Sequence, residues 1–365
     1  MKIVYKVFSI LGMLWLITDV LLVFGVLEVG ILEKMGFKGS IGLLFVVFVL
    51  YLLFEKPFKM KRTKITIAQF GKYLPYLPLY IAEKKGFFKA EGLDVSFDDS
   101  GGDDKTWKKI VNNEAQFGVG DPTILSTQGN DCKGKLIASL MQKACIYGVT
   151  KKKIPNINKI EDFEGYKVAV FKKPNTIYEF AQYINRINSK NLSLKPLELI
   201  EIDHPDKIYN YANDANVDIT MAVEPIATDL ETKGFDIIFS GAKLFPNILF
   251  TGIFVTENYL KENREIVQSF ISALNKSLEF IQNDHPATLK IATQEFPKPN
   301  TPLDIEIATL KLFRQGIFPV NSIVNEDSWQ EAFKMRFEDI APNEYKFKDF
   351  VDNTFTQEAI KNRKK

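Results

Sequence analysis

The sequence predicts an α/β fold of two lobes, each built on a doubly wound sheet, joined by two crossovers and preceded by two N-terminal membrane helices. Two long apolar runs lie within residues 1–62. Strand-like and helix-like segments then alternate from residue 63 to residue 255, which is typical of parallel sheets with helices on both faces. A polar stretch after residue 150 divides this alternation into two series, which indicates two lobes.

The composition is that of an ordinary globular protein without a strong overall charge. Of 365 residues, 46% are hydrophobic and 25% are charged, enough for a sizeable core. The 47 basic and 45 acidic residues nearly cancel, so the charge does not indicate a nucleic-acid partner. Cys132 and Cys145 are compatible with one disulfide or with two buried thiols. With His204 and His285 as the only histidines, we expect no metal and no cofactor.

The first 62 residues are expected to form a membrane anchor followed by a basic linker. Residues 7–27 are apolar apart from Ser9, Thr18 and Asp19, long enough at about 1.5 Å per residue to cross a hydrocarbon core of about 30 Å. No small-residue cleavage site is present after this run, which argues against a removed signal peptide. A second helix, residues 39–55, spans only with help from its flanking residues. Asp19 either marks a function or faces the partner helix.

The first strand–helix–strand unit sets the pattern for the rest of the chain. Lys64–Phe70 alternates as a strand, Leu79–Lys85 reads as a helix and Leu93–Phe97 as a strand. Gly86 stands where a left-handed helix cap is needed. The loop after Phe70 therefore lies at the carboxyl end of a strand, where open α/β sheets bind ligands.

The remaining elements continue the alternation. Strands are expected at 116–119, 135–140, 144–150, 166–171, 197–202, 219–223, 235–239 and 248–255, and helices at 105–113, 124–128, 176–187, 205–212, 226–233 and 264–281. With crossings near Thr150 and Phe250, we expect residues 63–150 and 250–365 to form the first lobe and residues 151–249 the second.

The first unit resembles the opening of periplasmic substrate-binding proteins for nitrate, sulfonates, taurine and thiamine-pyrimidine precursors. The matching residues are Leu77, Pro78, Tyr80, Ala82, Gly86, Phe88, Gly92, Leu93 and Val95, with Leu77 in place of the usual Ala. The resemblance extends from Ile65 to about Ala292. It implies a periplasmic-binding-protein-like fold of type II, hinge closure on a small-molecule ligand, and a permease and an ATPase of an ABC transporter as partners.

The loop after the first strand supplies the first candidate ligand-binding residues. Phe70, Tyr73 and Tyr76 offer an aromatic platform for a flat ligand, and Lys72 offers a charge for an anion. The alternative is that both tyrosines are half-buried packing residues.

Three further strand ends supply candidates. Asp121 and Thr123 open a helix and either bind ligand or cap that helix. Asn175 and Thr176 occupy the corresponding edge of the second lobe, where the resembled family has a turn rich in Gly, Ser and Thr. Glu224 either accepts a hydrogen bond from a ligand amine or from Lys72, or is a negative charge at the start of a helix.

Three classes of function fit these features. The first is a membrane-anchored solute-binding protein for import, and the second is a membrane-tethered sensor or accessory subunit that uses the same closure. The third is an enzyme like the thiamine-pyrimidine synthases that resemble this fold, whose chemistry needs a Schiff-base lysine, a reacting histidine and a cysteine-rich motif. Because the sequence has no cysteine cluster, and neither His204 nor His285 lies at a predicted cleft edge, we expect no enzyme.

Lysine and arginine near the two apolar runs predict a membrane orientation. The N-terminal flank carries Lys2 and Lys6, the hairpin Lys34 and Lys38, and the last flank Lys56, Lys59, Lys61, Arg62 and Lys64. With two spans across the inner membrane, the basic last flank places the adjoining domain in the cytoplasm, whereas one span places it outside. The receptor of an importer must lie outside the cell membrane, whereas the flanking charges favour the cytoplasm. The sequence therefore does not decide on which side of the membrane the soluble domain lies.

The membrane topology is therefore expected to decide the function: two spans imply a sensor or accessory role, and one span implies an external receptor. Alkaline phosphatase and, separately, a fluorescent protein are fused after Lys365. A bright fluorescent fusion with inactive phosphatase indicates two spans and a sensor or accessory role. Active phosphatase with a dark fluorescent fusion contradicts the inward-facing arrangement and indicates an external receptor.

Overall fold

The computed structural model describes residues 62–127, 133–191, 193–296, 301–337 and 345–363. These belong to one compact unit, Arg62–Lys365. The expected membrane helices at 7–27 and 39–55 lie outside the described residues. In the part that is described, no helix is both long and apolar enough to cross a bilayer.

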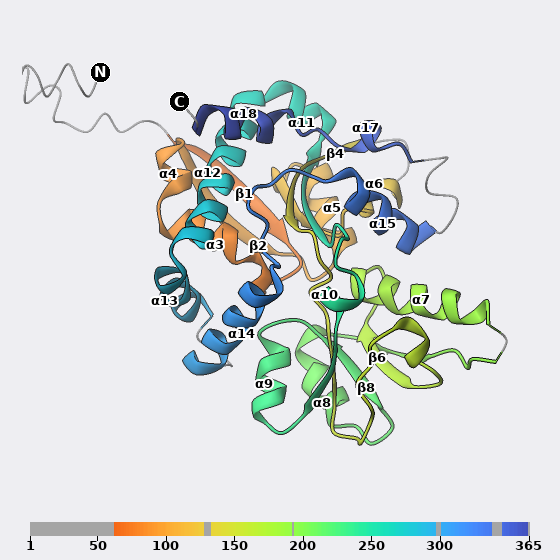
Figure 1. Cartoon of the computed structure of the whole chain (residues 1–365). Helices are drawn as coiled ribbons and strands as arrows, with labels where there is room; N and C mark the ends of the chain where they lie inside the picture. The colour runs from red at the N-terminus through yellow and green to blue at the C-terminus, as the bar shows by residue number, and fades with distance from the viewer. Residues whose placement is uncertain (1–61, 128–132, 192, 297–300, 338–344, 364–365) are drawn as a thin grey trace, which may run out of the picture. The chain divides into compact units, whose positions relative to one another are not determined.

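Two five-stranded sheets form the framework of this unit (Figure 1). The first has the order β2-β1-β3-β10-β4 and contains β1 (Thr63–Gln69), β2 (Leu93–Asp99), β3 (Phe117–Gly120), β4 (Gly134–Met141) and β10 (Thr251–Thr256). The second has the order β7-β6-β8-β5-β9 and contains β5 (Tyr147–Thr150), β6 (Lys167–Phe171), β7 (Glu198–Ile202), β8 (Ile219–Ala222) and β9 (Asp236–Ser240). We call each sheet with its helices the first and the second lobe.

One strand in each sheet runs against its neighbours, which corrects the expectation of wholly parallel sheets. β10 is antiparallel to β3 and β4, and β5 is antiparallel to β8 and β9. Both strands enter their sheet from the other lobe, β5 through residues 142–146 and β10 through a passage that begins with the short helix α10 (Gly241–Leu244). A strand that arrives at the edge where its neighbours end must run in the opposite direction.

The chain passes from the first sheet to the second between β4 and β5, and returns between β9 and β10. The first of these passages, residues 142–146, precedes the crossing expected near Thr150, because β5 already pairs in the second sheet. Cys145 lies in this passage and is a buried free thiol, so it forms no disulfide. Cys132 is outside the described residues.

Helices cover the faces of both sheets. The second lobe carries α7 (Thr176–Ser189), α8 (Ile208–Ala212), α9 (Ile226–Thr232) and α10 (Gly241–Leu244), with the 3-10 turns Ile160–Asp162 and Pro205–Lys207. The first lobe carries α3 (Leu77–Lys84), α4 (Phe87–Ala90), α5 (Asp103–Val111) and α6 (Ile124–Thr127), with the 3-10 turn Leu74–Tyr76. These bounds lie within about two residues of most helices that the sequence predicts, and Gly86 adopts the predicted left-handed conformation, with φ of 70°.

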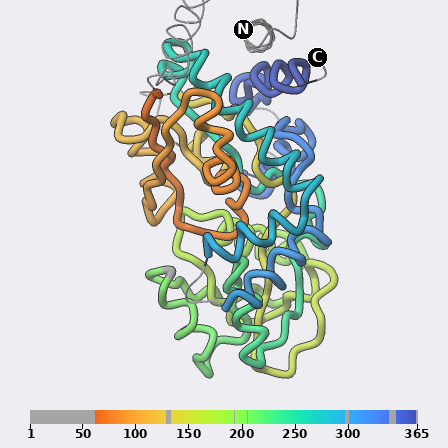
Figure 2. The backbone as a smooth tube through the Cα atoms, turned by 90° about the vertical axis from the view of Figure 1, so that its left-hand side faces the viewer, coloured from red at the N-terminus to blue at the C-terminus, as the bar shows by residue number. Residues whose placement is uncertain are grey.

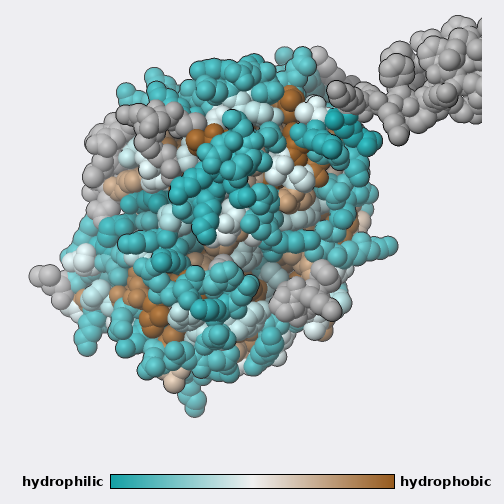
Figure 3. All heavy atoms as spheres, turned by 180° about the vertical axis from the view of Figure 1, so that it is seen from behind, coloured by the Kyte–Doolittle hydropathy of each residue, from teal (hydrophilic) through white to brown (hydrophobic). Residues whose placement is uncertain are grey.

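The C-terminal segment is helical, as predicted, and most of it returns to the first lobe. It comprises α11 (Glu257–Glu262), α12 (Arg264–Asn283), α13 (His285–Glu295), α14 (Pro302–Gln315), α15 (Glu326–Phe337), α17 (Phe347–Phe350) and α18 (Thr354–Arg363). α12 packs on α3 and α4, so these distant segments lie side by side (Figure 2). The surface in Figure 3 is mainly hydrophilic with scattered apolar patches, in keeping with a unit whose apolar residues are largely internal.

An aromatic stack fastens α12 to the first sheet. The rings of Phe117 in β3 and Phe270 in α12 are stacked, with centroids 4.0 Å apart, and both side chains are fully buried. Phe88 of α4 joins them, with its ring centroid 5.3 Å from that of Phe270. The stack therefore ties the C-terminal segment to the start of the fold.

We expect Phe117→Ala to lower the free energy of unfolding by about 3–5 kcal/mol, because it removes a fully buried ring and leaves a cavity. Urea unfolding of the purified full-length chain measures this loss. Phe280→Ala is the matched control: its ring is half-buried, and we expect a loss of roughly 1–2 kcal/mol. Equal losses in the two variants would contradict the assigned role of the stack.

Candidate ligand-binding site

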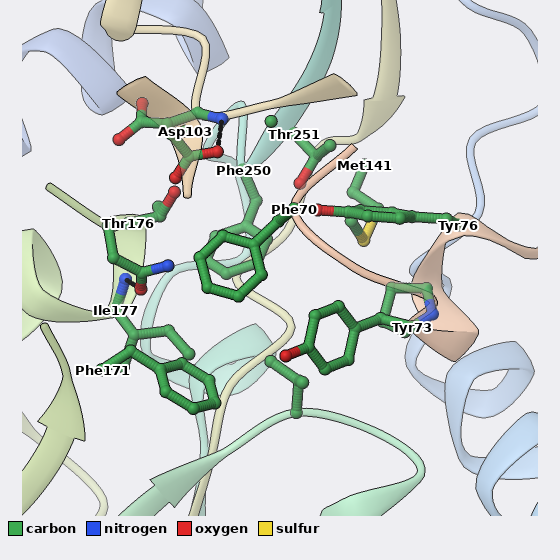
Figure 4. Close-up of a pocket in the computed structure, with 15 residues that line it drawn as sticks. Phe70, Tyr73, Tyr76, Asp103, Met141, Phe171, Thr176, Ile177, Phe250 and Thr251 are labelled. Atoms are coloured by element: carbon green, nitrogen blue, oxygen red, sulfur yellow. Dashed lines mark hydrogen bonds between the residues drawn. The ribbon is translucent and has the colours of Figure 1, made fainter. Parts of the chain in front are cut away.

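The carboxyl ends of parallel strands from both sheets meet at one cavity of about 50 Å³ (Figure 4). We call it the inner cavity. Its lining consists of Phe70, Tyr73, Pro75, Tyr76, Asp103, Gly120, Asp121, Met141 and Thr251 with Phe250 from the first lobe and the return passage, and Phe171, Asn175, Thr176, Ile177 and Val223 from the second lobe. A volume of this size holds a few water molecules or a small head group.

A wider depression of about 730 Å³ adjoins the inner cavity, and Phe70 and Tyr73 line both. We call it the outer mouth. Its charged residues are Lys72, Asp99, Lys105, Asp203, Asp206 and Glu295. His204 also lies there, although the sequence placed neither histidine at the cleft edge. Two aromatic side chains, Phe70 and Tyr73, thus form the boundary that the smaller and the larger space share.

Aromatic rings from both lobes form the wall of the inner cavity. The ring of Phe70 lies 6.0 Å from that of Phe171 across the two lobes and 5.8 Å from that of Tyr73. The rings of Tyr73 and Tyr76 meet edge to face at 6.3 Å. Burial raises the pKa of both tyrosines, so their hydroxyls stay protonated and able to donate hydrogen bonds.

Asp121 is a fully partnered carboxylate. Its Oδ1 accepts hydrogen bonds from the backbone N–H and the hydroxyl of Thr123, at 2.8 and 2.7 Å. Its Oδ2 accepts from the Arg336 guanidinium at 2.9 Å. The Thr123 hydroxyl therefore donates a hydrogen bond to Asp121 and accepts one from Arg336, and Thr123 lies outside the inner cavity. These contacts match the second role expected from the sequence, in which Asp121 caps the turn that it opens.

Asp103, the first residue of α5, is the other carboxyl of the cavity and has far fewer partners. It is 3% exposed, and among the described residues its carboxyl accepts one hydrogen bond, from the backbone N–H of Asp121 to Oδ1 at 3.2 Å. Gly120 makes room for it, since a Cβ there would lie 2.2 Å from Oδ1. Burial, and secondly the charge of Asp121, raise the pKa of Asp103 to about 8.

The second lobe presents the start of α7 to the cavity. Asn175 caps this helix, because its side-chain oxygen accepts a hydrogen bond from the backbone N–H of Ile177 at 2.8 Å. Thr176, the first residue of the helix, lines the cavity beside it. The turn that precedes them thus ends in a capped helix.

Six of the nine sequence-predicted site residues line the inner cavity. They are Phe70, Tyr73, Tyr76, Asp121, Asn175 and Thr176. Lys72 lies in the outer mouth, where its ammonium is 3.3 Å from the Glu295 carboxylate. The structure brings these residues together, and their role in ligand binding stays a prediction.

The predicted pairing of Glu224 with Lys72 is wrong. Glu224 is fully buried and accepts hydrogen bonds from the backbone N–H and hydroxyl of Thr228, both at 3.0 Å. The ammonium of Lys311 in α14 lies 3.9 Å away. Glu224 therefore takes the alternative role, a negative charge at the start of α9, and burial raises the pKa of its carboxyl.

Sequence reasoning missed several residues of the inner cavity. Phe171 ends a strand whose end the sequence located correctly, so strand-end position was the available signal there. Phe250 and Thr251 lie at the start of β10, which begins at Thr251 and not at residue 248 as expected. Asp103 lies in the polar segment that opens α5, where it looks like a solvated acid. Among the described residues no group of His, Cys, Asp and Glu has the arrangement of a metal site.

Known proteins resemble this chain in sequence. Residues 75–288 match the NMT1/THI5-like family. YtlA of Bacillus subtilis, named as a binding protein, is 25% identical over 305 residues, which cover 81% of this chain and 88% of that protein. The 4-amino-5-hydroxymethyl-2-methylpyrimidine phosphate synthase THI13 of Saccharomyces cerevisiae is 22% identical, with coverage of 62% and 69%.

Solved structures share the fold. The ligand-binding component of an ABC-type import system from Staphylococcus aureus aligns with a TM-score of 0.66 and 13% identity, covering 82% of this chain and 99% of that one. The periplasmic nitrate-binding protein NrtA from Synechocystis PCC 6803 aligns with a TM-score of 0.63 and 12% identity, covering 83% and 89%. These likenesses confirm the predicted two-lobed, periplasmic-binding-protein-like fold.

Asp103 is expected to make stability depend on pH. Its pKa rises from 3.8 to about 8 on folding, so between these pH values the folded chain holds a proton that the unfolded chain has lost. Stability from this group is therefore fully present below about pH 4 and falls as pH rises toward 8. We expect the melting temperature of Asp103→Asn, relative to the unsubstituted chain, to increase between pH 5 and pH 8.

Thermal unfolding of the full-length chain at a series of pH values measures this difference. Asp104→Asn is the matched control, since Asp104 occupies the same helical turn but lies outside the inner cavity. A constant difference for Asp103→Asn across the series would show that its carboxyl is not perturbed by burial.

Proposed function

Because the chain belongs to the NMT1/THI5-like family, we propose that it is a membrane-anchored solute-binding protein whose lobes close on a small organic or anionic ligand, for ABC-type import. The main support for this proposal is the inner cavity. It lies at the strand ends of both lobes, and residues of both lobes line it. A ligand in that position touches both lobes at once.

Relatives support this proposal. YtlA is named as a binding protein, and the Staphylococcus aureus protein with the same fold is a component of an ABC-type import system. An import role implies a permease and an ATPase as partners, and requires the lobes to face the outside of the membrane. Anchoring rests on the apolar runs at 7–27 and 39–55.

Contacts between the lobes indicate how closure is held. The Arg336 guanidinium, which pairs with Asp121, also lies 3.5 Å from the Glu179 carboxylate of α7. On α14, Gln315 accepts a hydrogen bond from the Tyr147 hydroxyl of β5 at 2.7 Å. α14 and α15 therefore bridge to the second lobe, and opening the cleft would loosen these contacts.

A sensor or accessory role is the second candidate. It uses the same fold and closure, and the basic flank before residue 65 favours it, because that flank predicts a cytoplasmic domain when both apolar runs span. The phosphatase and fluorescent fusions after Lys365 separate this role from import.

An enzyme is a remote third candidate, supported by the yeast synthases at 22% identity. A pyridoxal phosphate enzyme of that kind needs a lysine at the reacting centre. No lysine lines the inner cavity, whereas Lys72 and Lys105 line the outer mouth together with His204. The cysteine-rich motif that this chemistry also needs has no counterpart in a sequence with two cysteines, so the residues do not match that enzyme's full set.

The proposal predicts binding coupled to closure. A thermal-shift screen of the full-length chain, purified in mild detergent, covers pyrimidines, sulfonates, taurine and nitrate. We expect at least one compound to raise the melting temperature, and the same compound at saturation to reduce the radius of gyration measured by small-angle scattering with matched-out detergent. A stabilising ligand without a change in radius would count against hinge closure, and the absence of any stabilising ligand would count against the receptor role.

A further inference from the structure

The inner cavity has an unusual charge for a receptor that takes small anions. Asp103 and Asp121 are its ionisable acids, and no lysine, arginine or histidine lines it among the described residues. The cation that contacts Asp121, Arg336, also contacts Thr123 and Glu179. An anion in this cavity would meet two carboxyls and no cationic side chain in the lining.

The two carboxyls differ in how many hydrogen bonds they accept from the protein. Both oxygens of Asp121 accept hydrogen bonds, so its negative charge is balanced within the protein. Asp103 is equally buried, but its Oδ2 receives no hydrogen bond from the described residues. Oδ2 is not among the buried atoms that lack a partner, so it is accessible from the cavity that Asp103 lines. A ligand that supplies an N–H donor with positive charge would therefore satisfy a carboxylate whose side chain is otherwise largely removed from water.

The other walls also suit a cation. Phe70, Tyr73, Tyr76, Phe171 and Phe250 surround the cavity with aromatic rings, whose faces attract positive charge. In the outer mouth, Glu295 pairs with Lys72 and Lys84, and Asp203 pairs with Lys207, so the charges of this wider space are largely balanced. The preference for a cation therefore rests on the inner cavity.

The start of α7 is the feature that favours an anion, because a helix N-terminus carries partial positive charge. Asn175 already caps that end, and the same small cavity contains both Asp103 and Asp121. A full negative charge at the helix would therefore share the cavity with Asp103 and would be repelled by that carboxyl once it ionises.

Building on the proposed solute-binding function, we propose that the inner cavity takes a cationic nitrogen head group of a flat organic ligand, such as a guanidinium, amidinium or protonated amino-heterocycle. The Asp103 carboxylate accepts hydrogen bonds from this head group, and the aromatic rings enclose it. The rest of the ligand extends past Phe70 and Tyr73 into the outer mouth. Sulfonates, taurine and nitrate are excluded as the preferred ligands.

Guanidinium, urea and nitrate test this assignment, because they share a planar three-armed shape and differ in charge. Calorimetric titration of the full-length chain at constant ionic strength compares their affinities. We expect guanidinium to bind at least about tenfold more tightly than urea or nitrate, since a charge-assisted hydrogen bond to a buried carboxylate contributes roughly 1.5–3 kcal/mol. Asp103→Asn should abolish this preference, and Asp104→Asn should preserve it.

The pH profile provides a second readout that needs no variant. Asp103 must be ionised to hold a fixed cation, so guanidinium affinity in the unsubstituted chain should rise between pH 6 and pH 9. The charged and titratable groups that face Asp103 are Asp104, Asp121, Arg336, Tyr73 and Tyr76. In Asp103→Asn the affinity should be weak and independent of pH.

Three results would overturn the assignment. Tighter binding of nitrate than of guanidinium would reject the ligand class and leave the receptor function standing. Equal loss of guanidinium binding in the Asp103→Asn and Asp104→Asn variants would remove Asp103 from the site. If guanidinium does not bind, the inference fails, and the thermal-shift screen then tells whether the receptor function fails with it.

Discussion

The direction of two strands determines where the candidate ligand-binding site lies. β5 and β10 each enter a sheet from the opposite lobe, and each runs against its neighbours. This is possible only if both sheets turn their carboxyl edges toward the gap that the chain crosses. The loops after β1, β3, β6 and β8 are therefore gathered at one place, and the inner cavity is lined by them.

Burial gives the two aspartates of the inner cavity different chemical environments. Two aspartates lie within one small cavity, and the protein provides enough hydrogen-bond donors and positive charge for one of them. Asp121 becomes part of the framework, since it holds Thr123 and Arg336. Asp103 keeps an unmatched oxygen and a raised pKa. A desolvated carboxyl of this kind favours a neutral or cationic partner over an anion, whatever ligands other members of the family bind.

The C-terminal helices α14 and α15 link the residues around the inner cavity to the opening and closing of the lobes. Arg336 on α15 contacts Asp121 in the first lobe and Glu179 in the second, so one guanidinium joins the binding cavity to the contact between lobes. Lys311 on α14 similarly lies beside Glu224 and Glu231 of the second lobe. Opening would expose buried charges at both positions, and a ligand that spans the cavity would favour the closed arrangement by its own contacts.

The sequence by itself determined the order and approximate bounds of the strands and helices, because hydrophobic periodicity, glycine caps and strand ends are local properties. It also located Tyr73, Tyr76, Asn175 and Thr176 at strand ends, where ligands bind. Only the tertiary structure decided that β5 and β10 are antiparallel, that Glu224 bonds to Thr228 and meets Lys311 instead of Lys72, and that Asp103 is buried. Those features depend on which residues meet across large sequence separations, and Asp103 lies in a polar segment that only the packing of α5 against β3 removes from water.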